Sequence, residues 1–286
     1  MVYTIQQRQS EERKLSPTTE HNYMRQYNFL TSLFGSESDW VVHSSTKKLV
    51  ENIKSLESKD SNKLVYLNIF IIIKKYHNLD YHLLDDLRNK LMKSNEKHTV
   101  KNLEQKKEDL PTHLEIETYI NSLYKQQDWV NYLVNELIFE NCLRNKDINL
   151  YIISLANYKK EKDKTKNYLI IKKNETQLLI RDYKTKGVYG EKSIRLRSKK
   201  IYNAASRLGE GWLLQKADNS PVGMNELAYY IRLYEHNNKK LTESDYCKIR
   251  IFQIQNESNP LQKLHQISYS RGTDINTLAV HYNIDI

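Results

Sequence analysis

Glycine and proline are scarce in this sequence, and their scarcity restricts the folds that the chain can adopt. Only seven glycines and four prolines occur in 286 residues. These two residues punctuate turns and irregular loops, so a chain with so few of them has little room for long loops. Apolar residues recur every three or four positions over much of the sequence, which is the period of an α-helix. We therefore expect a mostly α-helical protein.

The charge balance favours a polyanionic partner. The sequence holds 45 Lys and Arg residues against 35 Asp and Glu residues, a formal net charge of +10. Nucleic acid is the commonest polyanion that strongly basic proteins bind. A solvated cationic surface without such a partner is the alternative interpretation.

The cysteines and the apolar runs constrain the compartment. Cys142 and Cys247 lie far apart and have no Cys or His neighbours at metal-ligand spacing, so neither a disulfide framework nor a structural zinc site is expected. The most apolar run, residues 64–73, contains an Asn and is much shorter than the roughly 20 residues of a membrane-spanning helix. The polar start, residues 1–14, does not resemble a signal peptide. We expect an intracellular protein that does not cross a membrane.

The first third of the chain predicts a helical domain over residues 16–105, preceded by a flexible arm over residues 1–15. Ser16 and Pro17 are typical of a helix start, since Ser can cap free amide groups and Pro fits the first turn. Four segments with helical spacing follow, at residues 23–34, 49–56, 64–73 and 83–91. They predict four short helices in one compact domain.

A polar stretch that ends near Asp109 indicates a linker at residues 106–111 and a second domain at residues 112–286. Helical spacing predicts helices in this domain at residues 112–124, 127–142, 198–208, 224–236 and 242–255, and again near the C-terminus. Short apolar runs of strand type occur at residues 168–171, 177–180 and 193–196. The glycine-containing basic segment 183–190 predicts a hairpin tip. The expected fold class is mostly α with a small antiparallel β-sheet, as a helical domain followed by a mixed α/β domain.

An ordered set of residues in the second half of the chain suits metal-free phosphodiester chemistry. That chemistry needs a nucleophile, cations that neutralise charge growing on the phosphate oxygens, and an acid for the leaving oxygen. The sequence lacks the spaced carboxylates with which a two-metal nuclease binds its ions. It does contain three cationic residues followed by a tyrosine, in the order Arg144, Lys184, Arg250 and Tyr282. We expect neither a metal nor a cofactor.

The two arginines belong to apolar helical segments. Arg144 follows the apolar segment 127–142, and a guanidinium placed there could bind two phosphate oxygens at once. Asp147, three residues on, could orient it, although an ordinary surface Arg–Asp pair has the same spacing. Arg250 follows Ile249 and therefore emerges from a segment that is expected to be buried.

The acid and the nucleophile are predicted from position. Lys184 lies at the expected hairpin tip and is the candidate acid, with Lys186 as its nearest competitor; a solvated turn lysine is the alternative. Tyr282 lies 32 positions after Arg250. A phenol has a pKa near 10, so a tyrosine nucleophile needs cations nearby to favour the phenolate. A tyrosine in a C-terminal helix can equally be a docking residue.

In its order and spacing, this set resembles the tyrosine recombinase (phage integrase) family, whose residues run Arg, hairpin Lys, His/Lys-x-x-Arg, His/Trp and Tyr. The segment Leu143-Arg-Asn-Lys-Asp-Ile148 resembles the family's first box, Leu-Arg-x-x-Glu/Asp-Leu/Ile, and looks most like recombinases of large DNA viruses and virophage- or Polinton-type elements. The gap from Arg250 to Tyr282 is close to the usual one. Residues 16–105 are similar to the SAM-like core-binding domain, and residues 112–286 to the catalytic domain.

Two positions depart from the family pattern. Cys247 stands where the His/Lys-x-x-Arg box has a cationic donor, and Thr273 stands at the His/Trp position, after the expected Gly272. The Thr273 hydroxyl could still bond a phosphate oxygen. Lys248 or Arg271 could supply the missing charge.

The resemblance implies a site-specific DNA recombinase or integrase. Tyr282 would attack the scissile phosphate and form a 3′-phosphotyrosyl link, while Lys184 protonates the leaving 5′-oxygen. Arg144 and Arg250, assisted by Thr273, would stabilise the transition state without metal or ATP. The implied partner is double-stranded DNA at attachment or terminal-repeat sites, bound by a homotetramer in a host nucleus, a viral factory or a bacterial cytoplasm.

Three alternatives stay open on the sequence. The departures at Cys247 and Thr273 are compatible with a catalytically degenerate relative that only binds DNA. A type IB topoisomerase uses nearly the same residues but relaxes supercoils as a monomer. The last alternative is a basic helical interaction protein in which the motifs occur by chance.

Overall fold

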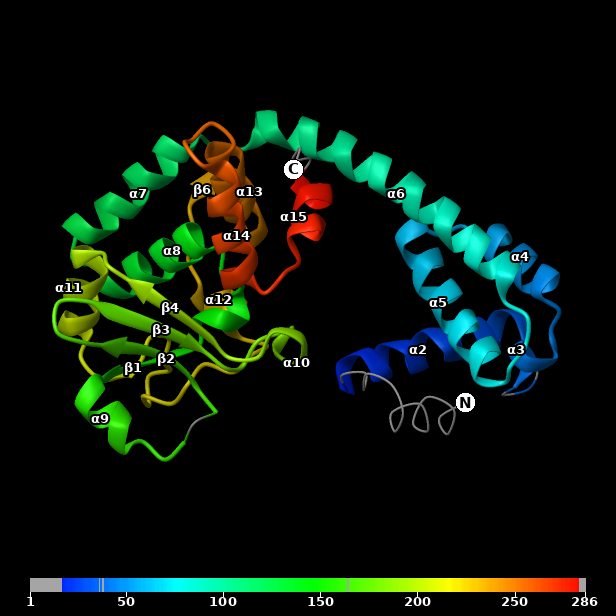
Figure 1. The fold of residues 1–286 in the computed structure, drawn as a ribbon, viewed down its shortest axis with the longest axis horizontal. Coiled ribbons are helices and arrows are strands. Elements are labelled where there is room, and N and C mark those ends of the chain that lie inside the picture. Colours follow the sequence, from blue (N-terminus) through cyan, green and yellow to red (C-terminus); the bar gives the residue numbers. More distant parts are fainter. Residues whose placement is uncertain (1–16, 36, 38, 164, 283–286) are drawn as a thin grey trace. The chain divides into compact units, whose positions relative to one another are not determined.

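A computed structural model describes residues 17–35, 37, 39–163 and 165–282 (Figure 1). The chain divides into two compact units, Met1–Asn102 and Leu103–Ile286. The arm expected at residues 1–15 lies outside the described residues. Within the described part, no helix is both long enough and apolar enough to span a bilayer.

The first unit is a set of helices packed around α5. Its helices are α2 (Pro17–Phe34), α3 (Trp40–His43), α4 (Thr46–Ser55), α5 (Asp60–Tyr76) and the start of α6 (His82–Asp109). Helix α5 contributes Leu67 and Phe70 to the core, and Trp40 of α3 meets the Phe70 ring edge-on. The buried ammonium of Lys74 donates hydrogen bonds to the carbonyl oxygens of Val42 and Ser44, which satisfies the C-terminal end of α3. The apolar run 64–73 is thus a core helix.

The second unit combines helices with two small sheets. Its elements are α7 (His113–Lys125), α8 (Trp129–Asn141), η2 (Asn145–Ile148), β1 (Leu150–Ser154), α9 (Leu155–Lys160), β2 (Asn167–Ile171), β3 (Thr176–Ile180), α10 (Lys186–Tyr189), β4 (Lys192–Leu196), α11 (Lys199–Leu208), β5 (Gly211–Trp212), α12 (Leu227–Tyr230), β6 (Glu235–His236), β7 (Lys239–Lys240), α13 (Glu243–Ile254), α14 (Pro260–Arg271) and α15 (Ile275–Tyr282). The expected fold class, mostly α with a small sheet, is confirmed.

The larger sheet is mixed rather than purely antiparallel. Its strand order is β4-β3-β2-β1-β5, and only β1 and β2 run parallel, with Leu150 opposite Asn167. Parallel neighbours need a crossover connection, which α9 and the residues after it supply. The antiparallel hairpin β3–β4 carries the short helix α10 at its tip, beyond the strands (Figure 1).

Helix α8 is the centre of this unit. It packs against α7, α11, α13 and α14, so it is apolar around most of its circumference. Its one buried amide, Asn135, is fully used: it donates to the carbonyl oxygens of Asn131 and Arg232 and accepts from the Tyr246 hydroxyl at 2.6 Å. This core fixes the end of α8, where Arg144 follows.

Two expectations about the backbone are corrected. The helix expected at residues 224–236 is only the single turn α12, because the chain becomes extended after it and buries Ile231 and Leu233 two positions apart. Asn237 and Asn238, both at positive φ, then close the β6–β7 hairpin. Residues 106–109, expected as part of a linker, continue helix α6.

Candidate active site

The turn between α14 and α15 is the frame of the candidate site. Gly272 ends α14 with a φ of 61°, in the left-handed region that glycine adopts without strain. The Thr273 amide donates to the Ser268 carbonyl at 3.0 Å, and the Ser268 hydroxyl donates to the Thr273 carbonyl at 2.6 Å. These two bonds fix the backbone of Thr273 at the start of the turn.

Arg144 reaches this turn from the end of α8. Its Nη2 donates to Thr273 Oγ1 at 2.9 Å, and its Nη1 donates to the Arg271 carbonyl oxygen. Cys142, in the left-handed region with a φ of 49°, ends α8 and turns the chain toward the site. Burial, and then the charge of Arg271, lower the pKa of the Arg144 guanidinium. The contact joins residues 129 positions apart.

Arg271 completes a reciprocal arrangement with the first arginine. Its Nη1 donates to the Cys142 carbonyl oxygen at 2.9 Å, while its own carbonyl accepts from Arg144. The end of α8 and the end of α14 are thus held together by two guanidinium groups. Two arginines in one partly buried place form a site that favours an anion.

Asp147 lies beneath the arginines and is fully buried. Its Oδ2 accepts from the Arg144 backbone amide at 3.1 Å, while its Oδ1 has no hydrogen-bond partner among the described residues. Burial raises the pKa of this carboxyl, and the Arg144 amide and the Lys192 ammonium oppose the rise. The predicted neighbours Arg144 and Asp147 do lie together, although the bond between them is to the backbone.

Lys192, the first residue of β4, is a member of this group that the sequence analysis missed. Its side chain is fully buried, and Nζ donates to the Ser270 carbonyl at 3.1 Å and lies 3.5 Å from the centroid of the Tyr183 ring. Burial lowers the pKa of this ammonium to about 8. The alternation of inward and outward residues along β4 could have indicated that Lys192 is buried, because Lys192, Ile194 and Leu196 share the inward face.

Lys184 and Lys186 are both exposed in the hairpin between β3 and β4. The residues on either side of Lys184 approach the α14–α15 turn: the Thr185 hydroxyl donates to the Gly272 carbonyl at 2.6 Å, and the Tyr183 ring packs beside Gly272. Lys184 is therefore held at the edge of the site by its neighbours. Lys186 begins α10.

Arg250 has partners different from those of Arg144. Its guanidinium donates to Gln253 at 2.7 Å, to Glu257 at 3.1 Å and to Glu140 at 3.2 Å. It lines a groove of about 810 Å³ between α8, β4 and α14, which also contains the cationic side chains of Arg195, Arg197 and Lys263. The structure does not bring Arg250 into a hydrogen bond with the Arg144 group.

The two departures from the family pattern lie in different environments. Thr273 is hydrogen-bonded to Arg144, as described above. Cys247 is buried in an apolar cluster with Cys142, Ile251 and Ile254, and neither cysteine forms a disulfide. Lys248 binds Asp245 at 3.0 Å. Arg271 is therefore the cationic neighbour that this structure places beside Arg144.

Tyr282 is the last residue of α15, and its side chain lies outside the described part of the structure. Helix α15 starts two residues after Thr273 and packs along α14 (Figure 1). Among the described residues, no group of three or more His, Cys, Asp or Glu side chains is placed to hold a metal ion.

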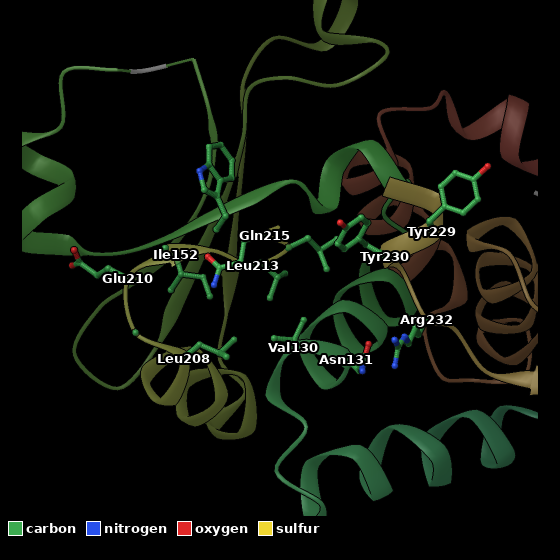
Figure 2. Close-up of a pocket in the computed structure, with 14 residues that line it drawn as sticks. Val130, Asn131, Ile152, Leu208, Glu210, Leu213, Gln215, Tyr229, Tyr230 and Arg232 are labelled. Atoms are coloured by element: carbon green, nitrogen blue, oxygen red, sulfur yellow. The ribbon is translucent and has the colours of Figure 1, made fainter. Parts of the chain in front are cut away.

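A separate cavity lies away from these residues. It has a volume of about 400 Å³ and is lined by Val130 and Asn131 of α8, Leu208, Leu213, Tyr230 and Arg232, among others (Figure 2). None of the predicted site residues lines it. Its walls mix apolar, aromatic, amide and charged side chains.

The lowered pKa of Lys192 predicts a pH-dependent stability. Between pH about 8 and the ordinary lysine value, the unfolded chain binds more protons than the folded chain, so stability rises with pH over that window. We expect the free energy of unfolding of wild type, relative to Lys192→Met, to rise by on the order of 3 kcal/mol across it. Urea unfolding of both proteins at pH 7.5 and pH 10 measures the difference. If the free energies of unfolding of wild type and Lys192→Met differ by the same amount at both pH values, the result contradicts the burial of a charged lysine.

Among the comparisons with known proteins, the search of solved structures finds similar chains. No model of a known protein family matches the chain, and no curated protein matches it. Among solved structures, the chain is similar to the crystal structure of XerA recombinase, with a TM-score of 0.40 and 11% sequence identity, over 99% of this chain and 92% of that chain.

Proposed function

We propose that this protein is a tyrosine-type DNA recombinase, which cuts and rejoins DNA strands through a 3′-phosphotyrosyl intermediate. The observation that carries the proposal is the hydrogen bond of 2.9 Å between Arg144 Nη2 and Thr273 Oγ1. It joins Arg144, the first member of the ordered set, to Thr273, which stands at the family's His/Trp position nine residues before the tyrosine proposed as nucleophile. Arg271 and Lys192 add positive charge at the same place.

The proposed chemistry gives each residue a separate role. The Tyr282 oxygen attacks the phosphorus and passes its proton to solvent water, and the bond to the 5′-oxygen breaks as Lys184 donates a proton to that oxygen. Arg144 stabilises the charge on the non-bridging oxygens. A guanidinium has five N–H donors, and two of these bond Arg271 and Thr273; among the described residues no hydrogen bond uses the others, so they can bind phosphate. In the reverse step, a 5′-hydroxyl attacks the phosphotyrosyl link and releases the phenol.

Arg250 is proposed as the second arginine of the site. Reaching a phosphate requires it to exchange Glu140 and Glu257 for phosphate oxygens. The groove that it lines carries more cationic than acidic side chains, and burial raises the pKa of Glu136 there to about 7. Partial protonation of that carboxyl near neutral pH further favours a polyanion in the groove.

The proposed partner is double-stranded DNA at attachment or terminal-repeat sites, bound by four copies of the chain. The formal charge of +10 supports a partner whose affinity comes mostly from phosphate contacts. On this basis the affinity for DNA should fall steeply as salt concentration increases. The proposed assignment of the first unit to DNA binding and of the second unit to catalysis rests on the sequence resemblance.

A covalent adduct tests the proposed reaction. A duplex from a terminal repeat, nicked beside the scissile phosphate, traps the phosphotyrosyl protein because the short cut strand diffuses away. We expect wild type to form an adduct that survives SDS, and Tyr282→Phe to form none, since phenylalanine has no nucleophile. Tyr229→Phe is the control, because this tyrosine is 85% exposed and remote in sequence from the site. Wild type without an adduct on any terminal or attachment-site duplex would overturn the catalytic proposal.

A second function, DNA binding without strand cleavage, has its own support. Arg250 is held by two carboxylates, and Cys247 lies in an apolar cluster instead of offering a cationic donor. A chain in which neither residue binds phosphate would still bind DNA through its basic groove. Salt-sensitive DNA binding by wild type without any adduct distinguishes this function from the first.

A further inference from the structure

Lys192 is the residue whose placement the proposed chemistry does not explain. It is a fully buried lysine on a strand, and a buried ammonium loses the hydration that stabilises it in water. An apolar side chain of similar length would fill the same space without that loss. The lysine therefore lowers the stability of the fold at neutral pH, and its positive charge has another use.

The contacts of Lys192 show what it holds. Its Nζ donates to the Ser270 carbonyl, which belongs to the last turn of α14. A Cβ on Gly272 would lie 2.5 Å from the same Nζ, so the ammonium lies directly against the backbone of the α14–α15 turn. The ring of Tyr183 covers its other side. Lys192 thus connects β4 to the turn that carries Arg271 and Thr273.

The charges around Lys192 come from three elements. Asp147 of η2 attracts the ammonium, whereas Arg144, just before η2, and Arg271 of α14 repel it. The Tyr183 phenol faces it from the hairpin, and burial raises the pKa of that phenol, which keeps it neutral below pH 10. The pKa of Lys192, about 8, lies between pH 7 and pH 9.

We propose that Lys192 is the positioning residue of an oxyanion site formed by Arg144, Arg271 and Thr273. It holds the turn in place through Ser270 and Gly272, and it adds positive charge from beneath the two guanidinium groups. The ligand is a tetrahedral oxyanion, which in the proposed function is the phosphodiester group of DNA. The identity of that ligand rests on the proposed function, whereas the oxyanion site does not.

The site is tested with sulfate, which stays a dianion between pH 7 and pH 9. Calorimetric titration of the full chain at both pH values gives the affinity, and Arg144→Ala identifies the part of the heat that belongs to this site. We expect the affinity of wild type to fall roughly tenfold from pH 7 to pH 9, as a coupled charge is lost. Lys192→Met should bind weakly at both pH values, without the fall.

Two further variants separate charge from packing. Lys199→Met removes an exposed lysine at the start of α11, which has no part in the site, so it should keep the wild-type fall. Lys192→Arg keeps a charge at pH 9, so it should bind equally at both pH values. The proposal would be overturned if Lys192→Met bound sulfate with wild-type affinity and lost as much affinity as wild type between pH 7 and pH 9.

Two outcomes do not depend on whether the variants at Lys192 fold. The proposal is overturned if wild type binds sulfate equally at pH 7 and pH 9. It is also overturned if Arg144→Ala gives the same heat of sulfate binding as wild type. Neither result needs a change at Lys192. The strand-cleavage proposal is decided separately by the Tyr282 adduct. A pH-dependent sulfate site in a protein that forms no adduct supports the oxyanion site and rejects the cleavage, whereas an adduct with unaltered sulfate binding in Lys192→Met rejects only the role of Lys192.

Discussion

Arg144→Lys is expected to slow formation of the covalent DNA adduct by roughly 10²- to 10³-fold. Arg144 donates from two different nitrogens to Arg271 and Thr273, which orients the rest of its planar guanidinium. Lysine has one nitrogen on a flexible stem and cannot make these contacts and bind a phosphate as well. The variant keeps its charge, so the loss reports the geometry of the donors. The time course of adduct formation on the nicked duplex, measured on SDS gels, gives the rate.

The control for this substitution is Arg207→Lys, which changes an exposed arginine in the last turn of α11. It should leave the rate within about twofold. Equilibrium binding to an uncut duplex should change little in Arg144→Lys, because the number of cations is the same. An Arg144→Lys protein that forms the adduct at nearly the wild-type rate would remove Arg144 from the reaction.

Gly272→Ala is expected to destabilise the second unit by about 2 to 4 kcal/mol. Two effects add there. The backbone has a φ of +61°, which disfavours any residue with a Cβ, and the new methyl would lie 2.8 Å from both Thr185 Oγ1 and the Tyr183 ring and closer still to Lys192. Scanning calorimetry of the full chain measures the shift of the unfolding transition.

Two other glycines separate the two effects. Gly209 has a φ of +76° with nothing within 4 Å of an added Cβ, so Gly209→Ala should cost only the backbone strain, about 1 kcal/mol. Gly187 lies in α10 with open space around it, so Gly187→Ala should be neutral or slightly stabilising. If Gly272→Ala is no worse than Gly209→Ala, the close contacts at the turn do not exist in solution.

The elements with strong periodicity were predictable from sequence, and those defined by their partners were not. The helices around α5 and α8 and the strands β2, β3 and β4 were expected, since each buries a regular set of apolar residues. The strand β1 was missed, because its parallel pairing with β2 depends on a crossover that local pattern does not reveal. The expectation of a helix at residues 224–236 was wrong, because the spacing between successive apolar residues changes from four positions to two within this segment.

The candidate site divides in the same way. Residue order indicated Arg144 and Thr273, and the structure joins them by a hydrogen bond. Residue order could not reveal that Glu140 and Glu257 bind Arg250, because that contact depends on which faces of α8 and α13 meet. Lys192 was missed for an energetic reason: lysine is almost never fully buried, so an inward position on a strand is normally assigned to an apolar residue. The assignment of Arg144, Lys184, Arg250, Thr273 and Tyr282 to catalysis stays a prediction.

The turn between α14 and α15 is tied to two distant parts of the chain through two consecutive carbonyl groups. The Arg271 carbonyl accepts from Arg144 at the end of α8, and the Gly272 carbonyl accepts from Thr185 in the β3–β4 hairpin. A ligand that binds the exposed hairpin tip around Val188 and displaces it would therefore also displace the start of α15. We therefore expect a contact at the hairpin tip to be transmitted through the Thr185–Gly272 bond to the start of α15. Slower exchange of the Thr185 and Gly272 amide hydrogens when DNA is bound would be the signature of that mechanical link.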